Sequence, residues 1–174
     1  SKQHGLVTDK FPELFELTRQ LPNGIALDGE IIAFSDGKPL PYSILESRLR
    51  KHSVTRSVTA EAPVAFIAYD IMEYDGVDIR DKQLIDRRKI LEDLVDKTGN
   101  VSAMYISPLL EVRSARSLED LKMSSLQNNC RGLILKRKDS VYSAPGSRVS
   151  IVNGPFTVNA VLLYAQKGEQ SDMF

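Results

Sequence analysis

The stretch from Ala26 to Phe34, ALDGEIIAF, most constrains the fold, because it has the character of an apolar β-strand and yet carries two carboxylates. Side chains two positions apart on a strand point to the same side, so Asp28 and Glu30 share one face. Two acids on a largely buried strand are costly unless a cation, a hydroxyl group or backbone donors meet them. We therefore expect a polar partner over this face. The alternative is that both acids lie on the solvent face of an edge strand.

The overall composition sets limits on function. A chain of 174 residues can form one globular domain with its own core, or two small lobes. Its 23 basic residues balance 23 acidic ones, so any nucleic-acid binding has to use a local basic patch. The single cysteine, Cys130, excludes an intrachain disulfide and a cysteine-rich zinc site. We find no long apolar run and no secretion leader, and we expect a cytoplasmic protein without a membrane partner.

Strands and helices are interspersed along the chain. The strongest strand signal begins at Ala62 and ends at the turn Asp75-Gly76, and Ser35–Gly37 closes the first strand with a similar turn. These hairpin signals favour mostly antiparallel pairing and an α+β fold class. A late helix is expected to open at Ser117, where Ser-Leu-Glu-Asp has the form of a capping box. We also predict a helix over 11–20, a short helix that ends at about residue 50, and a helix over 82–97. Further strands are predicted near 103–107, 132–138 and 157–166.

Three further features could carry chemistry, and each has a simpler explanation. Tyr69 could stack on a base, although a core tyrosine bonded through its hydroxyl is commoner. Lys136 and Lys138 share a strand face and could hold phosphates, or they could be exposed lysines of an outer strand. The stretch from Ser47 to Arg56, SRLRKHSVTR, could bind a nucleic-acid backbone or be a solvated basic loop. Its four cationic side chains are Arg48, Arg50, Lys51 and Arg56.

Several segments, in order, resemble the adenylation (nucleotidyltransferase) domain of small bacterial ATP-dependent DNA ligases. They are LDGEII, FIAYDIMEYDGVDIRDKQLIDRRKILEDL, GLILKRKDSVY and FTVNAVLLYAQ. The match extends from Ser1 to about Gln166. The resemblance implies two antiparallel β-sheets flanked by helices, an ATP-grasp-like arrangement with the nucleotide between the sheets. It also implies that residues 1–174 are a partial adenylation domain, incomplete at its N-terminus and without the family's OB-fold domain.

The activity implied by the resemblance is the sealing of nicks in double-stranded DNA, with ATP and Mg²⁺ as cofactors. In that family a lysine attacks ATP to give lysyl-AMP, and AMP then passes to the 5′-phosphate of the nick. The 3′-hydroxyl finally displaces the AMP, while Mg²⁺ neutralises the crowded phosphates.

Matching positions imply roles for individual residues. Glu30 corresponds to the glutamate that serves the ribose and the metal, and Tyr69 to the aromatic residue that stacks on adenine. Lys136 corresponds to a lysine that helps to hold the AMP phosphate. Lys2 replaces an arginine, which keeps the charge and loses the bidentate fork. The basic stretch resembles the family's inter-strand loop, and we expect its DNA contacts to be Arg48, Arg50, Lys51 and Arg56.

The sequence also departs from the family pattern. No Lys-x-Asp-Gly nucleophile motif occurs, and we expect it upstream of Ser1, so this chain holds no catalytic nucleophile and should be inactive alone. Arg131 stands where the family has a metal-binding glutamate, and a guanidinium cannot ligate Mg²⁺. The fifth motif, SAPGSRVSIVNGP, lacks the family's lysines and tryptophans.

Two functional hypotheses remain open at this point. The chain is either a fragment of an ATP-dependent DNA ligase or a non-catalytic remnant that binds adenine nucleotide or DNA. Loss of the strand expected before Ser1 would leave a sheet edge unpaired, and this favours self-association or pairing with an upstream fragment.

Overall fold

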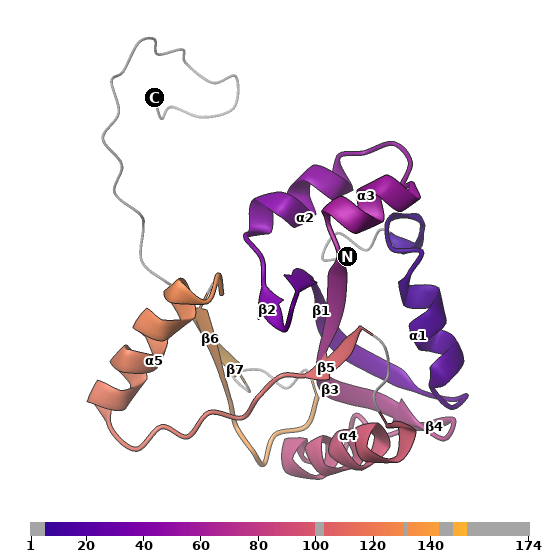
Figure 1. The fold of residues 1–174 in the computed structure, drawn as a ribbon. Coiled ribbons are helices and arrows are strands. Elements are labelled where there is room, and N and C mark those ends of the chain that lie inside the picture. The colour runs from indigo at the N-terminus through magenta and orange to yellow at the C-terminus, as the bar shows by residue number, and fades with distance from the viewer. Residues whose placement is uncertain (1–5, 100–102, 131, 143–147, 153–174) are drawn as a thin grey trace, which may run out of the picture.

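The computed structural model describes residues 6–99, 103–130, 132–142 and 148–152. At its centre is a twisted sheet in the order β2-β1-β3-β4, with β5 beside β3 (Figure 1). The two long strands, β1 and β3, pair antiparallel. The strand bounds are β1 (Ala26–Ser35), β2 (Lys38–Pro39), β3 (Val64–Tyr74), β4 (Val77–Asp78) and β5 (Met104–Ile106).

Two Asp-Gly turns close the hairpins of this sheet. Asp36 and Gly37 have φ values of 51° and 75°, and Asp75 and Gly76 have values of 53° and 74°. Two successive positive φ values are typical of the type I′ turn, whose twist matches that of the flanking strands. Both turns predicted from the sequence are therefore confirmed.

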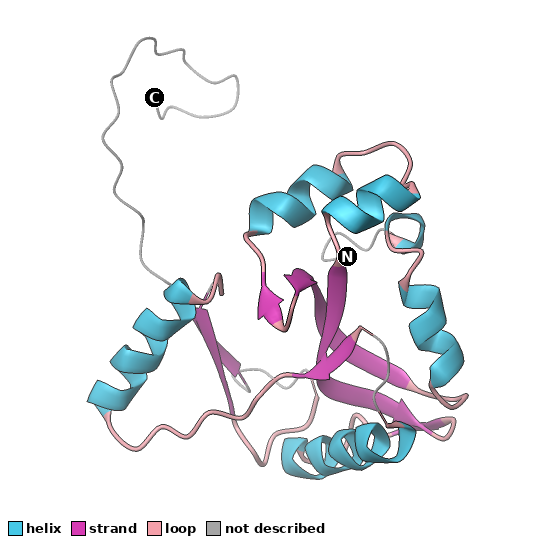
Figure 2. Cartoon of the chain, in the orientation of Figure 1, coloured by secondary structure: helices cyan, strands magenta, loops and turns pink. Residues whose placement is uncertain are grey.

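Helices cover the sheet as Figure 2 shows. Helix α4 packs on β3, and its fully buried Leu91 and Leu94 meet Ala68 and Ile71 of that strand in the main core. A second cluster, around Phe11, lies between α2 and the far part of β1. The helix bounds are η1 (Thr8–Lys10), α1 (Leu14–Gln20), α2 (Tyr42–Leu49), α3 (Arg56–Glu61), α4 (Leu84–Thr98) and α5 (Ala115–Gln127).

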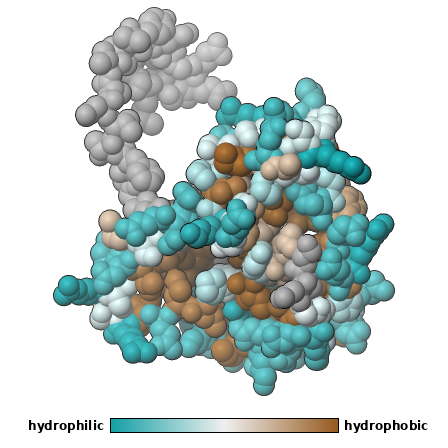
Figure 3. Space-filling model, viewed as in Figure 1, coloured by the Kyte–Doolittle hydropathy of each residue, from teal (hydrophilic) through white to brown (hydrophobic). Residues whose placement is uncertain are grey.

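A second, smaller sheet lies beside the first. It pairs β6 (Gly132–Lys136) antiparallel with β7 (Arg148–Val152), and α5 packs on β6. The segment after β6 is tied to α4 and to the loop after β4 by backbone hydrogen bonds, among them one from Leu84 N to the Ser140 carbonyl (2.8 Å). The predicted α+β class with two sheets and flanking helices is confirmed. Figure 3 shows apolar surface on this face of the molecule. On β6, Ile134 and Leu135 are exposed apolar side chains.

The mostly antiparallel pairing predicted from the hairpin turns is confirmed: among the described strands, only β5 pairs in parallel, with β3. Two local expectations need correction. The end of the basic stretch is the short helix α3, which Thr55 caps by accepting a hydrogen bond from Val58 N. Helix α5 begins at Ala115, and its cap is Ser114, whose hydroxyl accepts from Ser117 N (3.1 Å).

The strand predicted over 157–166 lies outside the described residues. None of the helices in the described part of the chain is long and apolar enough to span a membrane.

Candidate functional site

Tyr69 lies at an irregularity in the pairing of β1 with β3. The register passes from Asp28 opposite Asp70 to Gly29 opposite Ala68, which leaves Tyr69 without a directly opposed residue. An extra residue of this kind is a β-bulge, which bends a strand and re-aims a side chain. Its neighbours Ala68 and Asp70 are buried, whereas the Tyr69 side chain is only half-buried. The bulge therefore presents this ring at the edge of the core.

Two tyrosine hydroxyls meet the carboxylate of Asp28. Tyr142 donates a hydrogen bond to Asp28 Oδ2 at 2.9 Å, and the Tyr69 hydroxyl donates to the same side chain. Burial, the charge and hydrogen bond of Asp28, and the charge of Glu30 raise the pKa of Tyr69 to about 12. The Tyr69 phenol therefore stays protonated at neutral pH and donates its hydrogen bond to Asp28. The polar partner expected over this strand face is thus a pair of tyrosine hydroxyl groups. Glu30 itself is exposed to solvent.

Lys136 reaches Tyr69 from the second sheet. Its ammonium nitrogen lies 4.6 Å from the centroid of the Tyr69 ring and 3.7 Å from Asp70 Oδ2. An ammonium at this distance from an aromatic face makes a cation–π interaction. The structure thus brings together three of the residues predicted for the site, namely Glu30, Tyr69 and Lys136, on two different sheets.

A buried ion pair lies directly behind the site. Arg87 of α4 bonds both carboxylate oxygens of Asp70, with Nε–Oδ1 at 2.8 Å and Nη2–Oδ2 at 2.9 Å. Ile71 N also donates to Asp70 Oδ1 (2.9 Å), and the guanidinium lies 5.6 Å from the centroid of the Tyr142 ring. Sequence reasoning missed Asp70, Arg87 and Tyr142 as parts of the site. A carboxylate inside an apolar strand was the available signal for Asp70, because such a group needs a buried partner.

Gly29 separates the two acids for a steric reason. A Cβ atom at this position would lie 2.5 Å from the Ile67 carbonyl oxygen and 2.5 Å from an atom of the Phe66 ring. Only glycine lets β1 and β3 approach this closely with the Phe66 ring packed between them. The order Asp28-Gly29-Glu30 therefore follows from packing as well as from charge.

Arg48 is not a DNA contact, which corrects the sequence prediction. Its side chain is fully buried, and its guanidinium donates to the Glu13 carboxylate and to the carbonyl oxygens of Lys10 and Ala62. It also lies 5.1 Å from the centroid of the Phe11 ring. This arginine joins η1, α2 and the start of β3, so its role is structural.

The other three predicted DNA contacts lie at the protein surface. Arg50, Lys51 and Arg56 are exposed, and Arg50 also pairs with Glu46 at 2.8 Å. Their contact with DNA stays a prediction. Lys2 and Arg131 lie outside the described residues.

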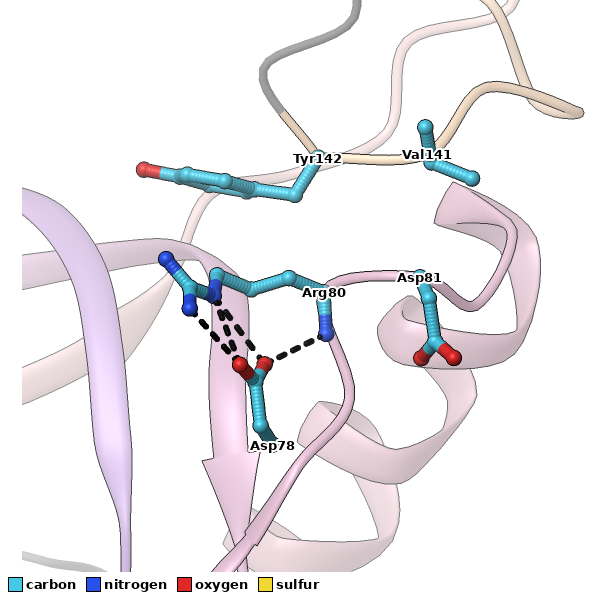
Figure 4. Close-up of a pocket in the computed structure, with 5 residues that line it drawn as sticks. All are labelled: Asp78, Arg80, Asp81, Val141 and Tyr142. Atoms are coloured by element: carbon cyan, nitrogen blue, oxygen red, sulfur yellow. Dashed lines mark hydrogen bonds and ion pairs between the residues drawn. The ribbon is translucent and has the colours of Figure 1, made fainter.

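A shallow pocket borders the far side of Tyr142 (Figure 4). It is lined by Asp78, Arg80, Asp81, Val141 and Tyr142. Arg80 and Asp78 form a bidentate ion pair, with Nη2–Oδ2 at 2.7 Å, and the hydrogen bonds from Arg80 lower the pKa of Asp78 to about 2. Because these charges neutralise each other, the pocket offers no unmatched cation to a phosphate. The nucleotide-binding candidates lie instead at Tyr69.

Comparison with known proteins places this arrangement in one family. Residues 1–151 match the family described as the ATP dependent DNA ligase domain. A DNA ligase from Methanocorpusculum labreanum is 32% identical over 169 residues, which covers 94% of this chain and 29% of that protein. A DNA ligase from Natronomonas pharaonis is 33% identical, over 82% of this chain and 25% of the relative. The chain thus spans less than a third of these curated relatives.

Solved structures agree with this. The ligase domain of LigD from M. tuberculosis superposes with a TM-score of 0.61 at 28% identity, covering 84% of this chain and 44% of that one. A mycobacterial DNA ligase D complexed with ATP and MES gives a TM-score of 0.63 at 27% identity, over 86% and 45%. The family match includes β1, β3 and β6, the three strands that carry the candidate site. The chain belongs to the ATP-dependent DNA ligase domain family.

Proposed function

We propose that this chain forms the adenine-nucleotide site of an ATP-dependent DNA ligase that seals nicks in double-stranded DNA. The single observation that carries the proposal is the convergence of Glu30, Tyr69 and Lys136 from two sheets. A flat ring, a carboxylate and an ammonium group are complementary to a purine, a ribose hydroxyl and a phosphate, respectively. The solved relative described as complexed with ATP supports the same ligand for this chain.

Tyr69 is suited to recognise the base. Its hydroxyl is fixed by Asp28, so the ring loses little rotational freedom when a purine stacks on it. Stacking of a base on an aromatic side chain contributes about 1–3 kcal/mol in nucleic-acid complexes. Glu30 is exposed beside this ring and is placed to accept a hydrogen bond from the ribose.

Mg²⁺ fits this site only if the phosphates of the nucleotide supply part of its coordination. Among residues 6–99, 103–130 and 132–142, no group of three or more candidate metal-ligating side chains occurs. Asp28 is already bonded to two tyrosines, and this leaves Glu30 as the carboxylate best placed for a metal. Mg²⁺ is commonly held by one or two carboxylates together with substrate phosphates and water, which matches this composition. The metal would neutralise phosphate charge in the reaction.

The covalent step of the family's reaction needs the nucleophilic lysine of a Lys-x-Asp-Gly motif, which does not occur in these 174 residues. In the family, a lysine amine attacks the α-phosphorus of ATP, a P–N bond forms, and pyrophosphate leaves. The printed sequence has no Lys-x-Asp-Gly motif, so the residues described here bind and orient the nucleotide. A non-catalytic protein that binds adenine nucleotide or DNA is the second candidate, favoured by Arg131 and the altered fifth motif, because these departures from the family pattern lie within the chain.

For the DNA partner, we infer that the exposed cations Arg50, Lys51 and Arg56 contact the phosphate backbone near the nick. Contacts of this type are electrostatic and sequence-independent, so they weaken as the salt concentration rises. Arg48 is excluded from the set because it is buried.

Calorimetric titration with ATP, in the presence and absence of Mg²⁺, tests the proposed function. We expect saturable binding by the native chain and a dissociation constant that is about tenfold or more higher for Tyr69→Ala, because stacking is lost. Tyr42→Ala is the matched control, since Tyr42 is an exposed tyrosine on α2. Absence of binding by the native chain, or equal affinity of the Tyr69→Ala variant, would overturn the proposal.

A further inference from the structure

We propose that Tyr142 is a positioning residue of the candidate nucleotide site, because its hydroxyl group holds the Asp28 carboxylate that anchors the Tyr69 ring. The inference rests on the proposed function and deepens it, since this ring is the surface on which the purine is expected to stack. Tyr142 acts from the segment after β6, whereas Asp28 and Tyr69 belong to the paired strands β1 and β3. The role requires no contact between Tyr142 and the nucleotide.

Tyr142 is held at its backbone, its ring and its hydroxyl group. Its backbone N donates a hydrogen bond to the Arg80 carbonyl oxygen at 2.9 Å. Its ring centroid lies 5.6 Å from the guanidinium carbon of Arg87, a distance at which a cation and an aromatic face attract each other. Arg87 is buried and bonds both carboxylate oxygens of Asp70, so this cation is itself held in place. The hydroxyl group that donates to Asp28 Oδ2 at 2.9 Å therefore has a defined position.

The Asp28 carboxylate passes this defined position on to Tyr69. An aspartate side chain has two rotatable bonds, and a single hydrogen bond leaves it free to turn. Asp28 is half-buried, and the hydroxyl groups of Tyr69 and Tyr142 both donate to it from different elements. A partly buried carboxylate that loses one donor gains by turning towards water. Removal of the Tyr142 hydroxyl group therefore loosens the hydrogen bond between Asp28 and Tyr69.

The bulge on β3 makes this anchor necessary. Tyr69 has no directly opposed residue on β1, so the pairing of the strands does not by itself fix the direction of its side chain. The side chain is half-buried between the buried residues Ala68 and Asp70. Ordering a mobile side chain reduces affinity when a ligand binds, whereas a ring that is already oriented avoids this cost. The anchored Tyr69 ring is thus expected to stack on a purine more tightly than a free one.

Titration of AMP into four forms of the chain tests the proposal. The forms are the native protein, Tyr142→Phe, Tyr69→Phe and the double variant, and Tyr142→Phe keeps the ring beside Arg87. We expect each single variant to bind AMP about three- to tenfold more weakly, as for the loss of one hydrogen bond. Because Tyr142 acts through the Tyr69 hydroxyl group, the double variant should bind AMP like Tyr69→Phe alone. Tyr105→Phe, the same change at an exposed tyrosine on β5, should keep the native affinity.

A merely structural role of Tyr142 would give a different pattern. If the losses of the two single variants add in the double variant, Tyr142 acts independently of the Tyr69 hydroxyl group and the proposal is overturned. Native affinity of Tyr142→Phe would overturn it as well. If Tyr142→Phe does not fold, Asp28→Asn replaces one acceptor oxygen by a donor and takes its place in the same cycle, with the same expected results.

A measurement without ligand separates this inference from the proposed function. In the native chain, the Hε protons of Tyr69 should show nuclear Overhauser effects to the Hβ protons of Asp28, and Tyr142→Phe should weaken them. If they weaken but the native chain binds no AMP, the proposed function fails although the anchor exists. If the native chain binds AMP and Tyr142→Phe leaves these effects unchanged, the positioning role is overturned and the proposed function stands.

Discussion

The side chain of Tyr69 is held through its own hydroxyl group, while its ring faces the ammonium group of Lys136. Asp28 accepts hydrogen bonds from Tyr69 and Tyr142, which lie far apart in the sequence. A carboxylate between two phenols orients both rings, and it makes the ionisation of Tyr69 costly. At the scale of single residues, the site is thus organised around Asp28, although Glu30 is the acid to which the family resemblance assigns a ligand role.

This arrangement predicts a dependence of stability on pH. Burial and the nearby carboxylates raise the pKa of Tyr69 to about 12 in the folded protein, compared with about 10 in the unfolded chain. The stabilisation that this group contributes is therefore complete below about pH 10 and is lost as the pH rises towards about 12. Urea unfolding at successive pH values should show a shallower loss of unfolding free energy for Tyr69→Phe than for the native chain. Equal slopes would contradict the assignment.

Arg48 and Arg50 give a second test at this scale. Both belong to one basic stretch, but only Arg48 is buried, where it bonds Glu13 and two carbonyl oxygens. Arg48→Met should lower the free energy of unfolding by about 3–5 kcal/mol, because it leaves buried acceptors and a carboxylate unpaired. Arg50→Met, its exposed neighbour, should change it by about 0.5 kcal/mol or less. Similar urea midpoints for the two variants would show that Arg48 is not structural.

At the scale of elements, the pairing of β1 with β3 places the site residues. The bulge at Tyr69 turns its ring away from the buried neighbours, and Gly29 permits the close approach of the two strands. Because of these two irregularities, β1 and β3 present Asp28, Glu30 and Tyr69 on one face of the sheet. The opposite face of the same strands still packs in the core.

Substitution of Gly29 tests this close approach. Gly29→Ala puts a methyl group 2.5 Å from the Ile67 carbonyl and from the Phe66 ring, so the strands must separate. Forced overpacking of this kind costs about 1–3 kcal/mol. Thermal unfolding should show a lowered midpoint. A native-like midpoint for Gly29→Ala would mean that β1 and β3 lie further apart than described.

The sequence predicted some elements well and others not. Alternation and Asp-Gly turns identified β1 and β3, because both signals are local. The parallel pairing of β5 depends on a contact between Phe66 and Met104, which are distant in sequence, and no local pattern encodes it. The cap of α5 was assigned to Ser117, whose hydroxyl does bond the helix start, but Ser114 lies at the cap position. Several serines in one short segment make such a choice ambiguous.

At the scale of the whole molecule, the two sheets together make the site. Backbone hydrogen bonds from Leu84 and Ile85 to the 138–140 segment, and from Tyr142 to Arg80, hold the second sheet against α4 and the loop after β4. Lys136 reaches Tyr69 because of this docking. The family resemblance predicted that Glu30, Tyr69 and Lys136 would meet, whereas periodicity alone left each with a simpler explanation. Asp70 gave a signal as a carboxylate inside an apolar strand, whereas the roles of Arg87 and Tyr142 depend on tertiary contacts that no local pattern encodes.

The whole chain is expected to bind nucleotide without reacting with it. The nucleophile motif does not occur in the printed sequence, so incubation with Mg²⁺ and ATP labelled at the α-phosphate should give no protein–AMP adduct on a denaturing gel. A labelled band would show that another lysine serves as the nucleophile. In that case the chain would be an active adenylyl acceptor, and the account of its chemistry would be wrong.

The central claim is that a purine stacks on Tyr69, and nuclear Overhauser effects measure that contact directly. In a spectrum of the chain with AMP, the H2 or H8 proton of the base should show cross-peaks to the ring protons of Tyr69. Tyr69→Phe should retain them at the shifted phenyl resonances, and Tyr69→Ala should lose them together with most of the affinity. Bound AMP whose base protons contact other residues, with no cross-peak to Tyr69, would contradict the account.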